Sequence, residues 1–106
     1  MIRARKVYTP EEIRKKITPV LKKNNVRKAV LFGPYATNEA NPNSCVDLFF
    51  DYAERPKGWA YWGVYGEIQE RLNRYIHIVE PDNKQVYLRE AKEIADTGIV
   101  LYENKS

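Results

Sequence analysis

Apolar residues along the chain alternate between helical and extended spacing. Between residues 10 and 24 they recur at steps of three and four, which predicts an amphipathic helix. Thr9 suits the N-cap of this helix, Pro10 its first position and Glu12 the third residue of a capping box. Pro19 falls inside the apolar stripe, so a kink or an early end of the helix is expected there.

The rest of the chain alternates strands with helices. Val26–Phe32 ends in four consecutive apolar residues, as expected for a central strand that is covered on both faces. Apolar residues in Tyr61–Leu72 return to helical spacing. The further predicted elements are the strands Cys45–Tyr52, Arg74–Glu80 and Ile99–Tyr102, the last of them an edge strand, and the helix Val86–Asp96. Strands alternating with helices indicate an α/β (α+β) fold.

The composition suits a single domain over residues 1–106. No apolar run approaches the length of about 18 residues that a membrane span needs, and the charged N-terminus does not resemble a signal peptide. A single cysteine suits a reducing cytoplasm. The net charge of +4 comes mainly from residues 3–6 and 14–28. We expect these to be solvated faces, and nucleic-acid binding is not favoured because no recognition motif accompanies them.

A second pattern concerns chemistry. The apolar strand 26–32 is followed by Gly33, and the next predicted strand carries Asp47. Residues two apart on a strand point to the same face, roughly 6–7 Å apart along it. Two carboxylates placed in this way can share a pair of Mg²⁺ ions that hold nucleotide phosphates and activate the attacking oxygen. The first of the two positions is Cys45, so the layout is that of a two-metal phosphoryl-transfer site with one carboxylate missing.

At these residues the chain resembles the minimal nucleotidyltransferase (MNT) family of the DNA-polymerase-beta-like superfamily. The family loop reads Gly-Ser-Tyr-Ala-Arg-Gly-Glu-Ala-x-Pro-x-Ser-Asp, and residues 33–45 here read Gly-Pro-Tyr-Ala-Thr-Asn-Glu-Ala-Asn-Pro-Asn-Ser-Cys. The likeness runs from Thr9 to Glu103. It implies a nucleotidyltransferase fold, with a small mixed sheet of about four strands flanked by helices. It also implies transfer of AMP from ATP with Mg²⁺, and an association with a HEPN-type toxin.

The departures from the family pattern fall on the positions that perform its chemistry. By the resemblance, Gly33, Pro34 and Ser44 stand at nucleotide-binding positions. Pro34 replaces a serine, which removes a hydroxyl and a backbone N–H that could hold a phosphate oxygen. Residues 37–38 replace an Arg-Gly pair, which removes a cation.

Cys45, Asp47 and His77 stand at the three metal positions of the family. Asp47 is the retained carboxylate, and therefore the one catalytic candidate. Taken singly, Cys45 is expected to be a small buried residue and His77 a core histidine with one nitrogen hydrogen-bonded. Taken together, a thiolate, a carboxylate and an imidazole could hold zinc, although a thiolate is a poor ligand for Mg²⁺.

An aromatic segment follows the second strand. Trp62 and Tyr65 lie three apart on one helical face, and Trp59 precedes them. Large aromatic side chains anchor interfaces, but they also fill cores beside sheets, and the sequence leaves both alternatives open. As a partner-binding segment, it would take up a HEPN-type protein or a second copy of this chain.

Two functions follow from these patterns. The preferred one is a catalytically impaired nucleotidyltransferase-fold protein that acts as an antitoxin-like binding partner of a HEPN-type toxin. The alternative is an active metal-dependent enzyme that uses Asp47 to transfer AMP from ATP to a hydroxyl of a protein or a small molecule.

Overall fold

The computed structural model describes residues 6–81 and 84–104. The elements in chain order are α1 (Pro10–Lys23), β1 (Val26–Phe32), β2 (Val46–Tyr52), α2 (Trp59–Leu72), β3 (Ile76–Val79), α3 (Lys84–Thr97) and β4 (Ile99–Glu103). The basic N-terminal segment noted in the sequence lies outside the described residues, except for Lys6.

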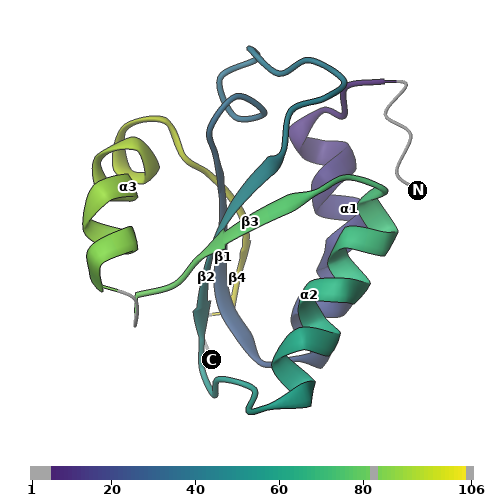
Figure 1. The fold of residues 1–106 in the computed structure, drawn as a ribbon, viewed down its shortest axis with the longest axis vertical. Coiled ribbons are helices and arrows are strands. Elements are labelled where there is room, and N and C mark those ends of the chain that lie inside the picture. Colours follow the sequence, from purple (N-terminus) through teal and green to yellow (C-terminus); the bar gives the residue numbers. More distant parts are fainter. Residues whose placement is uncertain (1–5, 82–83, 105–106) are drawn as a thin grey trace.

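The strands form one mixed sheet in the order β3-β2-β1-β4 (Figure 1). β1 is antiparallel to both of its neighbours, whereas β2 and β3 run parallel. The predicted four-stranded mixed sheet is therefore confirmed, with β1 in a central position and β4 at an edge. Parallel pairing of β2 with β3 follows from the connection through α2, because a crossover returns the chain to the same end of the sheet.

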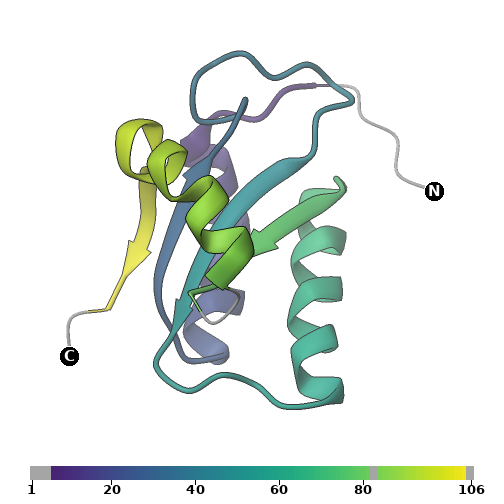
Figure 2. The same cartoon turned by 60° about the vertical axis from the view of Figure 1, so that its left-hand side comes forward.

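Helices cover both faces of the sheet. α1 and α2 lie on one face and α3 on the other, as Figures 1 and 2 show. The larger core lies between the sheet and the first two helices. Among the described side chains, the smaller core lies under α3 and consists of Val30, Phe32, Phe49 and Val79, with Ile94 of α3 packed against them. None of the helices in the described ranges is long and apolar enough to cross a membrane.

α1 begins as the sequence predicts. The Thr9 hydroxyl accepts from the Glu12 N–H at 3.1 Å, and the Glu12 carboxylate accepts from the Thr9 N–H at 2.9 Å, which completes the capping box. The early end expected at Pro19 is wrong, since the helix continues to Lys23. Ile17 and Val20, which flank this part of the helix, are fully buried, and their burial keeps the last turn helical despite the lost hydrogen bond.

The other boundaries differ slightly from those predicted. β1 agrees in full, whereas β3 is shorter at both ends, and α3 extends beyond the predicted Val86–Asp96. α2 begins at Trp59 rather than at Tyr61, directly after Gly58 with φ of +57°. Its first turn is exposed and adds nothing to the apolar stripe, so periodicity alone could not locate it.

Candidate functional site

Gly33 and Asp47 are brought together by the pairing of β1 with β2. Phe32 lies opposite Asp47 in the register, so the loop leaves β1 directly beside the carboxylate. Gly33 has φ of +74°, a conformation that L side chains rarely adopt. A Cβ atom added at Gly33 would collide with the Asp47 carboxylate. Glycine is therefore needed here for its backbone conformation and for the close approach of Asp47.

His77 is the neighbour of Asp47 on the parallel strand β3. The two residues are partners in the register, so their side chains share the face of the sheet that α3 covers. Cys45 directly precedes β2 and is exposed, and His77 is exposed as well. The expectations of a buried Cys45 and a core His77 are therefore wrong. Cys45 precedes the paired part of β2 and His77 lies on an edge strand, so neither is enclosed.

Asp47 is half-buried and its pKa is raised from 3.8 to about 6. Burial is the main cause, because it disfavours the charged form. The His77 side chain opposes this rise, whereas Glu93 and Glu90 of α3 add to it. Sequence reasoning did not single out these two glutamates. Their spacing of three on a predicted helix placed them on one face, but not beside Asp47.

The residues present fit a Mg²⁺ site poorly. Among residues 6–81 and 84–104, no group of three or more His, Cys, Asp or Glu side chains is arranged to hold a metal ion. Cys45, Asp47 and His77 are therefore neighbours along the sheet without forming a ligand set. Asp47 supplies the one carboxylate at these positions, and an exposed thiol does not replace a second carboxylate toward a hard cation.

The nucleotide-binding positions of the family lie in a loop whose polar groups largely bond to one another. The carbonyl of Gly33 accepts from the N–H groups of Ala36 and Thr37, at 2.9 and 3.2 Å. The Ser44 hydroxyl accepts from the Asn41 N–H at 3.0 Å, so it holds the loop together. Pro34 is exposed and has no N–H to offer. The described hydrogen bonds of this loop are therefore largely internal.

Tyr35 is a residue of this loop whose environment the sequence did not reveal. It lines a pocket of about 330 Å³ that lies between the loop and the start of α1. Its side chain is buried, and within the described residues its hydroxyl has no hydrogen-bond partner. A buried hydroxyl without a hydrogen-bond partner lowers the stability of the folded state, and the Tyr35 hydroxyl is such a group.

The aromatic segment divides between core and surface. Tyr65 is half-buried and donates its hydroxyl to the Ile76 carbonyl at 2.7 Å, which joins α2 to β3. Trp59 and Trp62 are 90% and 61% exposed. The core alternative therefore describes Tyr65, and the two tryptophans stay candidates for partner binding. α2 packs on the opposite face of the sheet from Asp47, so the structure does not bring the two sets together.

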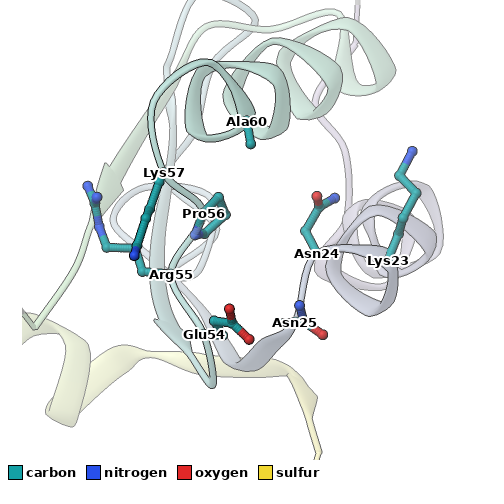
Figure 3. Close-up of a pocket in the computed structure, with 8 residues that line it drawn as sticks. All are labelled: Lys23, Asn24, Asn25, Glu54, Arg55, Pro56, Lys57 and Ala60. Atoms are coloured by element: carbon teal, nitrogen blue, oxygen red, sulfur yellow. The ribbon is translucent and has the colours of Figure 1, made fainter.

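A larger pocket of about 380 Å³ lies at the other end of the sheet from Gly33, where α1 ends and α2 begins (Figure 3). Its lining consists of Lys23, Asn24, Asn25, Glu54, Arg55, Pro56, Lys57 and Ala60. These side chains carry both charge signs, and none of them is one of the metal or nucleotide positions expected from the family. The pocket is therefore distinct from the Gly33–Asp47 site.

Comparisons with known proteins agree with the fold. The family described as "Polymerase beta, Nucleotidyltransferase" matches residues 15–106. A Methanocaldococcus jannaschii protein named "Putative protein adenylyltransferase MJ0435" is 30% identical over 88 residues, covering 78% of this chain and 95% of that protein.

Solved structures of toxin–antitoxin complexes are also similar. One, described as a toxin-antitoxin with AMP-PNP, has a TM-score of 0.70 at 20% identity and covers 87% of this chain and 74% of that one. Another, described as a tri-AMPylated Shewanella oneidensis HEPN toxin with an MNT antitoxin, has a TM-score of 0.66 at 17% identity, covering 92% and 75%. The fold, the Gly33–Asp47 geometry and the family match lead to one conclusion: the chain belongs to the polymerase beta nucleotidyltransferase family.

Proposed function

We propose that this chain is an MNT-type protein of the nucleotidyltransferase fold that acts as an antitoxin-like partner of a HEPN-type protein, with impaired nucleotidyl transfer of its own. The observation that carries the proposal is the state of the three metal positions. Asp47 keeps a carboxylate, whereas Cys45 and His77 are exposed and form no ligand set with it.

The chemical reason for the impaired transfer is the smaller negative charge at the metal positions. A two-metal site stabilises the charge that develops on the transferring phosphoryl group, a contribution worth several kcal/mol. One half-buried carboxylate with a raised pKa binds divalent ions less well than a pair would. Pro34 further removes a donor from the loop that would hold the triphosphate. ATP and Mg²⁺ are the ligands of the family, and this chain should bind both of them weakly.

The partner is proposed from the similar structures, which are complexes of an MNT antitoxin with a HEPN toxin. An acceptor hydroxyl must reach the phosphate, so a HEPN-type protein would dock at the Gly33–Asp47 end of the sheet. A cytoplasmic location belongs to the same proposal, since the lone Cys45 suits a reducing compartment.

A second candidate is active transfer of AMP to a protein hydroxyl. The name of the M. jannaschii relative favours it. Asp47 also supports it, because a carboxyl with a pKa of about 6 is largely ionised at neutral pH and could take part in metal binding.

A labelling experiment separates the two candidates. The chain is purified with a HEPN-type protein and incubated with α-labelled ATP and Mg²⁺ or Mn²⁺. We expect stable co-purification and negligible labelling of either protein. Strong labelling that is lost in Asp47→Ala but kept in Asp51→Ala would overturn the proposed impairment. Asp51 is a suitable control because it lies on the same strand and is paired with Arg27 at 3.0 Å.

A restoration experiment tests the geometry itself. The double variant Cys45→Asp with His77→Asp returns carboxylates to the family positions beside Asp47. We expect its Mn²⁺ affinity, measured by calorimetry, to exceed that of the wild type by at least about tenfold. Equal affinity in both proteins would mean that the three positions do not converge on a metal.

A further inference from the structure

We propose that residues 6–8 form a strap that the Arg74 guanidinium holds against the start of β3, and that release of this strap uncovers Arg74 as a binding group for phosphate. The inference is independent of the proposed function, because it involves neither the Asp47 carboxylate nor a partner protein.

Arg74 is a buried cation without a carboxylate partner. It lies between the end of α2 and the start of β3 and is 4% exposed. None of the ion pairs of the described residues involves Arg74. An arginine keeps its proton in proteins, so burial does not neutralise it. Buried charges are normally paired, because their removal from water costs free energy that a counter-ion offsets.

The groups around the guanidinium replace a counter-ion only in part. Nη1 donates to the Asn73 carbonyl at 2.8 Å, and Nη2 donates to the Lys6 carbonyl. The guanidinium carbon lies 4.7 Å from the centroid of the Tyr8 ring, which adds a cation–π contact. Nε is buried, and within the described residues it has no hydrogen-bond partner. Arg74 thus has a donor that the folded chain leaves unused.

The strap supplies two of these contacts, the Lys6 carbonyl and the Tyr8 ring. In the part of the chain that the structure describes, the backbone of residues 6–8 makes one hydrogen bond to another segment, and its donor is Arg74 Nη2. The capping box fixes the start of α1 separately, from Thr9 onward. The position of the strap therefore depends mainly on Arg74 and on the packing of the Tyr8 ring against the larger core.

The charge around the Tyr8 ring is mainly positive. Nζ of Lys16 and Nζ of Lys6 lie 5.3 and 5.6 Å from the centroid of the ring that Arg74 also approaches. Lys6 is paired with the Glu12 carboxylate at 2.6 Å. Lys16, like Arg74, forms no ion pair among the described residues. An anion that reaches this region would therefore meet two cations without carboxylate partners.

Release of the strap changes the surroundings of Arg74. With the strap in place, the guanidinium is buried without a counter-ion; with the strap released, it is open to solvent and to anions. A ligand that binds one of two states shifts the equilibrium toward that state. A planar guanidinium binds phosphate oxygens through two parallel hydrogen bonds, and the nearby Lys16 adds positive charge. Phosphate should therefore favour the released strap.

The strap is also one wall of the pocket of about 330 Å³ beside the loop that follows Gly33. Val7 and Tyr8 line this pocket from the strap, and Pro34 and Tyr35 line it from the loop. Release of the strap would open this pocket on the α1 side. Phosphate bound at Arg74 would thus alter the surroundings of the loop.

The test is cleavage of the full chain at the Lys6–Val7 bond by endoproteinase Lys-C, followed by mass spectrometry. A protease needs an extended, detached segment, so the cleavage rate reports the released strap. We expect inorganic phosphate to accelerate cleavage of the wild type by at least about threefold relative to sodium chloride at equal ionic strength. The Arg74 Nε–H resonance should shift over the same phosphate range. A wild-type rate that phosphate leaves unchanged overturns the proposal.

Substitutions of Arg74 separate its two roles. Arg74→Gln should accelerate cleavage by at least about tenfold and abolish the response to phosphate. Arg74→Lys keeps the charge but cannot bond both carbonyls, so its cleavage should be faster than in the wild type and still respond to phosphate. Arg71→Gln is the matched control, since Arg71 is an exposed arginine near the end of α2 and should behave as the wild type.

Two outcomes for Arg74→Gln would contradict the proposal. Cleavage at the wild-type rate would show that Arg74 does not hold the strap, and a retained phosphate response would place the anion elsewhere. Tyr8→Leu decides the matter if Arg74→Gln fails to fold. This variant removes the ring that covers the guanidinium and keeps Arg74, so cleavage should accelerate and the phosphate response should persist. Unchanged cleavage in a folded Tyr8→Leu, checked by far-UV circular dichroism, overturns the strap.

Discussion

Gly33 shows how one residue connects the backbone to the chemistry of the site. Its φ of +74° and its contact with Asp47 both exclude a side chain. We expect Gly33→Ala to lower the free energy of unfolding by about 2–3 kcal/mol, of which about 1–2 kcal/mol is backbone strain. Urea unfolding measures this loss. In an Asp47→Ala background the same substitution should cost only the strain, and an unchanged cost there would mean that the carboxylate contributes nothing.

Asp47 makes stability depend on pH. Its pKa is raised from 3.8 to about 6, so the folded state binds the proton more tightly than the unfolded state does. Stability should therefore fall as pH rises between about 4 and 6, and change no further through this group above that range. Asp47→Asn should raise the free energy of unfolding at pH 8 by about 1 kcal/mol, after allowance for solvent screening.

Unfolding in urea at several pH values checks this expectation. At pH near 3 the variant and the wild type should differ little, because Asp47 is then protonated in the folded state and mostly protonated in the unfolded state. The same pH slope in both proteins would show that another group is responsible.

The site could be predicted in part from sequence. Asp47 and Gly33 were found because a strand–Gly–strand pattern has a fixed geometry. The exposure of Cys45 and His77 was not found, since it depends on where pairing begins and on which strand forms the edge. Glu93 reaches Asp47 through the packing of α3, which no local pattern encodes.

Among the elements, α1 is hydrogen-bonded to β4 through the Arg14 side chain. Arg14 donates from Nε to the Leu101 carbonyl and from Nη2 to the Val100 carbonyl, each at 3.0 Å. The pairing of β4 with β1 is irregular at this point, so the guanidinium occupies carbonyls at a bulge. An edge strand with a bulge has few ladder bonds of its own, and Arg14 replaces some of them.

We expect Arg14→Met to lower the free energy of unfolding by about 1–2 kcal/mol, because the aliphatic stem is kept and two charge-assisted bonds are lost. Amide exchange in β4 should accelerate more than in β1. Lys15→Met is the matched control, since Lys15 is exposed on the same helix and should change neither. Equal protection of β4 in both variants would rule out the proposed role of Arg14.

Element boundaries were predictable wherever burial follows the local period. β1 and the start of α1 satisfy this condition, through four consecutive apolar residues and a complete capping box. The first turn of α2 does not, because Trp59 and Ala60 face solvent. The early end considered at Pro19 does not occur, because the burial of Ile17 and Val20 outweighs the preference of proline against a helix interior.

At the scale of the whole molecule, the two cores are unequal. Among the side chains that the structure describes, the layer under α1 and α2 is large, whereas α3 packs through Ile94 on a small cluster around Phe32 and Phe49. Ile94→Ala should therefore loosen α3 by about 1–2 kcal/mol, seen as faster amide exchange in α3 with little change in β1.

Ile68→Ala is the comparison for this prediction. Ile68 is fully buried in the larger core, so its truncation should cost about 2–5 kcal/mol and affect exchange throughout the molecule. If Ile94→Ala lowered protection in β1 as much as in α3, the two layers would form a single cooperative unit.

The sheet lies between α3 and α2 (Figure 2), so Asp47 on the α3 face is separated from the exposed Trp59 and Trp62 of α2. This separation governs how the free energies of changes at the two surfaces combine. Substitutions at well-separated sites without shared partners add in free energy. Binding at one surface should then leave the affinity of the other unaltered, which corresponds to a coupling free energy near zero. Substitution of Asp47 should consequently leave association through Trp59 unchanged, and replacement of Trp59 should leave any nucleotide binding beside Gly33 unchanged.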